Sequence, residues 1–369
     1  MINSLKDIPE VLLMGPGPSC VHPEVYSALS VPTIGHLDPR FIGIMDDIKV
    51  QLRAILNTKN SITVPMSGTG SAGMETCFVN LIEKGTRVLV LTNGVFGMRM
   101  QDVAARYGAE VESMEFEWGT PVDPEAVRRK LNDASYDIVA LVHAETSTGV
   151  MNPVAQIGEA VKATNALFLL DTVTSLGGTE VLLDEWGVDA LYSGTQKCLS
   201  CPPGLAPVSF SEKAVKALDE RSSKVMSWYL DLSMIKNYWE GAKRVYHHTA
   251  PINMLYALNQ ALALILSEGL EAVYQRHAAA HDALVAGVEK LGLEMLVEKP
   301  FRLPMLNAVK IPDSVDDAKV RSALLGNHEI EIGAGLGPLS GKIWRVGLMG
   351  HTARQENVDR FLDALSDII

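Results

Sequence analysis

The sequence predicts an α/β fold, with a large domain built on a mostly parallel sheet and a smaller α+β domain after it. Short apolar, β-branched runs alternate with helical stretches from about residue 60 to residue 211, which is the pattern of βαβ units. The chain has 369 residues, too many for one compact core, so two domains are expected. A long helical region is followed by short strands, one helix and a closing helix, which predicts the α+β domain.

Strands of the large domain are expected at the apolar runs, which cover residues 87–93, 110–116, 137–145, 166–174, 189–194 and 205–211. Helical patterns fill most of the gaps, at residues 70–83, 96–107, 124–132 and 153–164. Ligands of such sheets bind outside the carboxyl ends of the strands. Glu145, Asp171 and Lys197 fall at these ends.

The alanine- and leucine-rich region 253–291 predicts a long helix that links the two domains and breaks near Gly269. Beyond it, short strands are expected at 294–297, 307–311 and 342–346, a helix near 315–325 and a closing helix near 353–369. We therefore expect an N-terminal arm (1–14), a large domain that includes the start of the linking helix (15–268) and a small C-terminal domain (269–369).

Composition excludes several classes of partner. The net charge is −12 and no basic block occurs, so a nucleic-acid partner is not expected. No apolar run reaches about 18 residues, which argues against a membrane span. Residues 1–10 contain no apolar segment of the kind found in signal peptides, so a cytoplasmic location is expected.

No metal site is expected. Cys198 and Cys201 form a C-x-x-C pair, but no second pair completes a zinc site, so reduced thiols near a turn are the simpler interpretation. His247 and His248 are adjacent, and neighbouring histidines rarely share one ion; no carboxylate partner lies near them in the sequence.

The most informative pair is an aspartate and a lysine at the ends of two predicted buried strands. Asp171 alone could cap a helix, and a lone lysine in a turn is ordinarily solvated. Lys197, however, lies in an apolar segment, and a buried lysine is costly unless it is paired or covalently used. A lysine that forms a Schiff base and an acid that pairs with the pyridinium nitrogen are what pyridoxal phosphate requires. The pair predicts an enzyme with this cofactor.

The glycine-, serine- and threonine-rich turn at 67–73 precedes a predicted helix. Free backbone N–H groups and the helix dipole at such a turn suit a phosphate, although the turn could also be a simple helix start. It is neither a Walker A loop nor a dinucleotide fingerprint, since the required residues do not follow.

Other polar motifs allow two interpretations each. Segment 143–149 either caps a helix or places hydroxyl groups beside a ring, and segment 246–251 is either a polar loop or carries Tyr246 and Thr249 to a phosphate. Arg345 is either an exposed edge residue or a bidentate clamp for a substrate carboxylate.

Motifs in a fixed order make the chain resemble the class V, fold-type-I aminotransferases, and most of all the alanine–glyoxylate and serine–glyoxylate (serine–pyruvate) aminotransferases. They are Gly-Pro-Gly-Pro at 15–18, Ser-Gly-Thr-Gly at 67–70, Asn-Gly-Val-Phe-Gly at 93–97, Glu-Thr-Ser-Thr-Gly at 145–149, Asp-Thr-Val-Thr-Ser-Leu-Gly-Gly at 171–178, Tyr-Ser-Gly-Thr-Gln-Lys at 192–197, Pro-Pro-Gly at 202–204, Tyr-His-His-Thr at 246–249, Gly-Leu-Gly-Pro at 335–338 and Arg-Val-Gly at 345–347. The resemblance implies a seven-stranded sheet and a homodimer with shared active sites.

The resemblance also implies roles for individual residues. Lys197 would hold the cofactor and later move the substrate α-proton, while Asp171 would keep the ring nitrogen protonated. Val173 would pack on one ring face, Phe96 on the other, and Ser147 would lie by the ring hydroxyl. The phosphate would be bound by Thr69, Gly70, Ser71 and Gln196, with Tyr246 and Thr249 arriving from the other subunit.

On the substrate side, the resemblance implies that Arg345 grips the carboxylate and that Gly17 lies next to the substrate. One departure concerns Phe96, because the best-known family members carry tryptophan there. Phenylalanine still stacks on the ring, with less area and no N–H group.

The resulting expectation is a ping-pong transamination from a small amino acid, alanine or serine, to glyoxylate or pyruvate. Ureidoglycine–glyoxylate or 2-aminoethylphosphonate transamination are the alternatives, and cysteine desulfuration is less expected because all cysteines lie at or before position 201. A non-catalytic scaffold would not need the intact set of Asp171, Lys197 and Arg345. A nucleotide-binding protein would need a glycine fingerprint that is missing.

Overall fold

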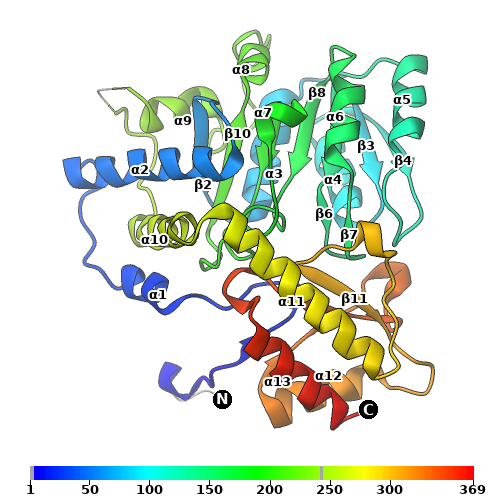
Figure 1. Ribbon diagram of the computed structural model, residues 1–369. Helices are drawn as coiled ribbons and strands as arrows, with labels where there is room; N and C mark the ends of the chain where they lie inside the picture. Colours follow the sequence, from blue (N-terminus) through cyan, green and yellow to red (C-terminus); the bar gives the residue numbers. More distant parts are fainter. Residues whose placement is uncertain (1–3, 242–243) are drawn as a thin grey trace.

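The computed structural model describes residues 4–241 and 244–369 and shows a layered α/β part above a smaller part that contains the C-terminal strands (Figure 1). The main sheet has seven strands in the order β2-β10-β9-β8-β5-β3-β4. They are β2 (Ile62–Ser67), β3 (Arg87–Thr92), β4 (Glu110–Glu115), β5 (Ile138–Val142), β8 (Leu167–Asp171), β9 (Ala190–Tyr192) and β10 (Leu205–Phe210). Only β10 runs against its neighbours, so the predicted mostly parallel, seven-stranded sheet is confirmed.

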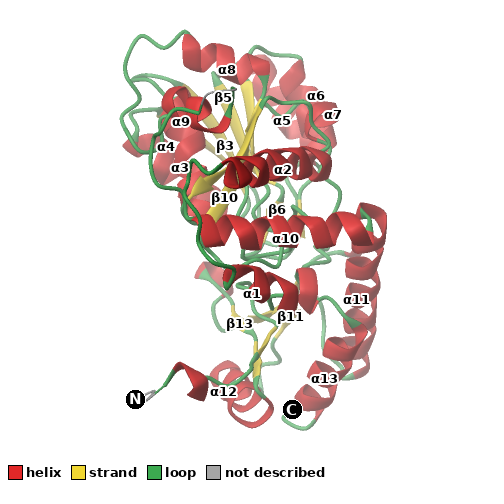
Figure 2. Cartoon of the chain, turned by 90° about the vertical axis from the view of Figure 1, so that its left-hand side faces the viewer, coloured by secondary structure: helices red, strands yellow, loops and turns green. Residues whose placement is uncertain are grey.

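Helices cover both faces of this sheet, with α3 and α4 on one side and α5, α6 and α7 on the other (Figure 2). Their bounds are α3 (Gly70–Leu81), α4 (Val95–Arg106), α5 (Pro124–Asp133), α6 (Val154–Lys162) and α7 (Leu183–Trp186). The other helices that precede residue 240 are η1 (Leu5–Asp7), α1 (Pro23–Leu29), α2 (Pro39–Leu56), α8 (Glu212–Asp219) and α9 (Leu232–Trp239). The central strands are buried on both faces, as parallel strands covered by helices must be.

The linking helix forms as α10 (Ile252–Glu268) and α11 (Leu270–Lys290), and it breaks at Gly269 as predicted, where φ is 89°. Beyond it lie a three-stranded antiparallel sheet and two helices that cover it. The remaining elements are η2 (Lys299–Phe301), β11 (Leu306–Lys310), α12 (Asp317–His328), β12 (Ile330–Glu331), β13 (Gly333–Ala334), η3 (Gly337–Leu339), β14 (Ile343–Gly347), η4 (Gly350–Thr352) and α13 (Gln355–Ser366).

Two expectations for strands need correction. Residues 294–297 form no strand, and only Met295 makes an isolated bridge, to Val309. The predicted strand 137–145 ends at Val142, and the following residues form a small hairpin of β6 (Ala144–Glu145) and β7 (Val150–Met151). The 145–149 motif therefore lies in a hairpin that directly follows the carboxyl end of β5.

Two large hydrophobic clusters fill the molecule. One lies around the main sheet, and the other joins α11, α13 and β14. The second cluster also contains Leu12 and Met14, because β1 (Leu12–Leu13) pairs with β12. The limits expected for the arm and the two domains stay predictions, and residues 1–3 and 242–243 within them lie outside the described residues.

None of the helices in the described ranges has both the length and the apolar character needed to cross a bilayer.

Candidate active site

A cavity of about 220 Å³ opens at the carboxyl edge of the main sheet. Many of the residues singled out in the sequence line it: Gly70, Ser71, Phe96, Asp171, Val173, Gln196 and Lys197. It is also lined by residues to which the sequence assigned no role, namely Met74, Arg99, Val142, Ala144, Thr146, Thr174 and Tyr192. The topology explains this meeting, since parallel strands bring their carboxyl ends to one edge.

Asp171 is the last residue of β8 and is 5% exposed. Burial raises the pKa of its carboxyl group to about 6, while two donors favour the ionised form: the hydroxyl of Tyr192 and the backbone N–H of Val173, at 2.7 Å from Oδ1. Tyr192 reads in the sequence as an ordinary core residue of a strand, so this partner was missed.

Lys197 follows β9 in a turn, and burial lowers the pKa of its ammonium group to about 8. Its Nζ donates to the carbonyl of Pro16. Gly17 lies so close to the lysine that a Cβ at this position would collide with the lysine side chain. Its φ of 104° also favours glycine. The predicted 15–18 turn therefore lies at the site, beside Lys197.

The start of α3 offers free backbone N–H groups to the expected phosphate. Thr69 is the N-cap of α3 but makes no side-chain hydrogen bond to the helix, so the first N–H groups of α3 remain available. Gln196 reaches the same cavity, and its buried Oε1 has no hydrogen-bond partner among the described residues. Turning the amide would present its N–H₂ group instead.

Phe96 lies in the first turn of α4, and Ser147 of the β6–β7 hairpin contacts that turn. The Ser147 hydroxyl accepts the N–H of Val95 at 3.0 Å, and the ring of Phe96 lies under the guanidinium of Arg99, 4.9 Å from its centroid. Val173 lines the cavity beside Asp171.

Arg345 lies on β14 and is 7% exposed, so the interpretation as an exposed edge residue is wrong. It donates to the carbonyl of Ala334 at 2.7 Å and to that of Thr146 at 3.3 Å, and burial lowers its pKa to about 10. Arg345 does not appear among the described residues that line the cavity, although Thr146 does.

Tyr246 and Thr249 do not line the cavity of their own chain. Both are exposed, Tyr246 by 56%, and neither is among the described residues that line it. Their hydroxyl groups are 3.4 Å apart, so they are presented together at the surface.

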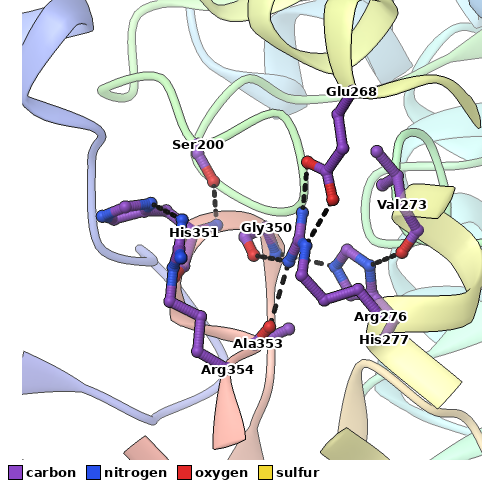
Figure 3. Close-up of polar contacts among 9 residues, drawn as sticks. All are labelled: Ser200, Glu268, Val273, Arg276, His277, Gly350, His351, Ala353 and Arg354. Atoms are coloured by element: carbon purple, nitrogen blue, oxygen red, sulfur yellow. Dashed lines mark hydrogen bonds and ion pairs between the residues drawn. The ribbon is translucent and has the colours of Figure 1, made fainter. Parts of the chain in front are cut away.

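The turn that carries Lys197 is held from two sides. The hydroxyl of Ser19 donates to the carbonyl of Lys197 at 2.7 Å, and the Ser200 hydroxyl accepts the N–H of His351 at 2.6 Å. Figure 3 shows that the segment 350–353 is in turn bound by α11.

In that contact, Arg276 donates to the carbonyls of Gly350 and Ala353 and pairs through two nitrogens with Glu268, across the break between α10 and α11 (Figure 3). His277 is fully buried and accepts the N–H of Gly350 at 2.9 Å. No motif in the sequence indicated this network.

Fold and site together define a pyridoxal-phosphate-dependent transferase of fold type I. The chain belongs to the class V aminotransferases, whose family pattern it matches over residues 24–361. It is 40% identical to (S)-ureidoglycine–glyoxylate transaminase of Bacillus subtilis, over 97% of this chain and 90% of that protein. It is also 40% identical to alanine–glyoxylate aminotransferase of Drosophila melanogaster, over 98% of this chain and 93% of that protein. The solved structure of alanine–glyoxylate aminotransferase from Nostoc sp. superposes with a TM-score of 0.97 at 47% identity, covering 100% of this chain and 97% of that one.

Pyridoxal phosphate is the cofactor of this family, and the residues present fit it. A buried acid and a lysine of lowered pKa face one cavity. The uncapped start of α3 and the unpartnered Gln196 amide suit the phosphate. Among the described residues, no cluster of side chains suits a metal ion.

Proposed function

We propose that this enzyme transfers the amino group of a small amino acid, alanine or serine, to glyoxylate or pyruvate. The proposal rests on one observation: Asp171 and Lys197 line the same small cavity. This cavity has a volume of only about 220 Å³, which favours substrates with short side chains. Relatives named for glyoxylate at 40% identity support the acceptor.

Bound pyridoxal phosphate supplies a protonated ring that withdraws electrons from the substrate α-carbon. The chain's own residues do the rest. Asp171 holds the proton on the ring nitrogen, and Nζ of Lys197, with a pKa of about 8, is neutral often enough to take the α-proton and return it. Arg345 binds the substrate carboxylate, after its guanidinium exchanges the carbonyl of Thr146 for the carboxylate oxygens.

Ureidoglycine–glyoxylate transamination is the second candidate, because the Bacillus subtilis relative of that name is 40% identical, as is the alanine–glyoxylate aminotransferase of Drosophila melanogaster. Cysteine desulfuration lacks a nucleophile at the site. Cys198 and Cys201 are buried, and burial raises the pKa of both thiols to about 12.

A half-reaction screen tests the proposal. Alanine, serine, glycine, 2-aminoethylphosphonate and (S)-ureidoglycine are added separately to the holoenzyme while the absorbance of the bound cofactor is followed. We expect fast conversion by alanine or serine, reversed by glyoxylate, and none in Lys197→Ala. Conversion by ureidoglycine alone would replace the proposal with the second candidate. A cofactor-loaded protein that responds to none of the donors would overturn both.

We also propose a homodimer with shared active sites. Tyr246 and Thr249 are exposed on this chain, and Met226, Trp228 and Val245 expose large apolar surfaces in the same region. Such a concentration of apolar surface is typical of an interface. The free state of all four cysteines supports action in the reducing cytoplasm.

A further inference from the structure

Glu145 is a fully buried carboxylate at the edge of the site, and none of the roles assigned above uses it. It lies in β6, and each of its oxygens accepts backbone or hydroxyl donors. Oε1 accepts the N–H of Ser147 at 3.1 Å and its hydroxyl at 2.6 Å, and Oε2 accepts the N–H of Phe96 at 3.1 Å. Its partners are thus the two residues expected at the cofactor ring.

The contact with Phe96 caps the start of α4. The N-cap of this helix is Gly94, which has no side chain to satisfy the first N–H groups. Ser147 takes the N–H of Val95 and Glu145 takes that of Phe96. A Cβ on Gly94 would fall 2.5 Å from the Ser147 hydroxyl, so the close approach of the two segments requires glycine. A carboxylate at this position is also stabilised by the helix dipole.

The contact with Ser147 fixes the direction of its hydroxyl. Its one hydrogen is donated to Glu145 and one lone pair is used by Val95, which leaves a single lone pair. Toward the ring, Ser147 can therefore only accept a hydrogen bond while Glu145 is ionised. Protonation of Glu145 would remove this constraint and release the hydroxyl hydrogen.

The charged and titratable groups facing Glu145 come from three strands. Asp171 on β8 disfavours its ionised form, Arg345 on β14 interacts favourably with it, and the buried hydroxyl of Tyr192 lies on β9. Burial is the largest influence and raises the pKa of Glu145 to about 7. Its protonation therefore changes near neutral pH.

We propose that Glu145 is a positioning residue that holds Phe96 and sets the hydrogen-bond direction of Ser147 at the cofactor ring. When the Glu145 carboxylate is ionised, it holds the backbone of Phe96 in place and leaves the Ser147 hydroxyl able only to accept a hydrogen bond from the ring. When the carboxylate is protonated, both contacts weaken. The inference depends on cofactor binding and not on the identity of the substrates, so it stands apart from the transamination screen.

The test is the affinity of the apoenzyme for pyridoxal phosphate, followed by absorbance, in Glu145→Gln and wild type at pH 6 and pH 8. Glutamine resembles the protonated acid, so we expect nearly equal affinities at pH 6. At pH 8 we expect about tenfold weaker binding in the variant, the loss typical of one charge-assisted hydrogen bond. A purely structural effect would weaken binding equally at both pH values, and that result, or unchanged affinity at pH 8, would overturn the proposal.

Two further variants keep the test decisive. Ser147→Ala removes the other end of the same contact, and combining it with Glu145→Gln should weaken binding less than the product of the two single effects. Additive losses would contradict the coupling. Glu112→Gln is the matched control, since Glu112 also accepts hydrogen bonds from two side chains but lies away from the cavity. It should leave the affinity and its pH dependence unchanged.

Discussion

Burial acts on Asp171 and Lys197 in opposite directions, because it disfavours the charged form of either group. It raises the pKa of the carboxyl to about 6 and lowers that of the ammonium to about 8. The lysine benefits, since a neutral amine is needed to take a proton. In its proposed role, the aspartate must be ionised to pair with the ring nitrogen. Its donors, Val173 and Tyr192, favour the ionised form and so oppose the effect of burial.

Tyr192→Phe tests this balance. Loss of the hydroxyl removes a donor to the ionised carboxylate, so the pKa of Asp171 should rise above its present value of about 6. A hydrogen bond to a charged group contributes about 1.5–3 kcal/mol, which corresponds to roughly 1–2 pKa units. We expect the acid side of the pH profile for pyridoxal phosphate binding to the apoenzyme to move to higher pH by about one unit.

The control for this measurement is Tyr136→Phe, which also removes a hydroxyl donated to a carboxylate, that of Glu112. The profile of the control should match wild type. An acid limb at the same pH in Tyr192→Phe and wild type would show that the tyrosine does not support Asp171.

The sequence predicted the residues of local motifs well and their long-range partners poorly. Asp171, Lys197 and the 67–73 turn were found because each stands at a strand or helix end that the pattern marks. Tyr192 and the network of Arg276 were missed because a buried tyrosine in a strand and an arginine on a helix are ordinary in any sequence.

At the scale of elements, neither β2 nor α2 was predicted from the sequence. Only β2 contains a residue that argues against the element. β2 contains Pro65, which argues against a strand. It is tolerated because β2 is the edge strand and Pro65 takes a non-hydrogen-bonded position in the pairing with β10, so no N–H is needed there. The helix α2, by contrast, had clear signals: Asp38 as N-cap, Pro39 at its first position and a buried face at helical spacing.

The segment 350–353 connects α11 to the Lys197 turn, and Gly350→Ala tests that connection. A Cβ there would lie 2.7 Å from the carbonyl oxygen of Cys198 and would also collide with the Ser200 hydroxyl, in the turn after Lys197. We expect a lower melting temperature and a shifted absorbance of the bound cofactor, because the turn must move. Gly341→Ala is the matched control, since φ is 71° there against 55° at Gly350 but no atom lies within 4 Å.

Both glycines share the backbone cost of a left-handed residue, about 1–2 kcal/mol. Only Gly350→Ala should alter the cofactor spectrum. If both variants lose stability equally and keep the wild-type spectrum, the segment does not position Lys197.

At the scale of the whole molecule, distant parts of the chain converge on the Lys197 turn. Ser19 from the N-terminal region holds its carbonyl, while Thr352 from the C-terminal region donates to the carbonyl of Leu13 and accepts the N–H of Cys20. No local pattern in the sequence indicates such long-range contacts. The same reasoning extends across the proposed dimer, where Tyr246 and Thr249 would complete the site of the partner.

Mixing two variants with defects at different residues of the proposed shared site tests this sharing. Lys197→Ala lacks the amine, and Tyr246→Ala lacks the proposed phosphate contact. In a mixed dimer, one site would combine both defects, and the other would receive Lys197 from one chain and Tyr246 from its partner, both intact. Subunits exchanged at equal amounts should therefore recover about a quarter of the wild-type activity by random pairing, measured after confirming dimers by light scattering. If each chain builds its site alone, the mixture should have no more activity than the average of the two variants, and a monomer in light scattering would contradict the dimer itself.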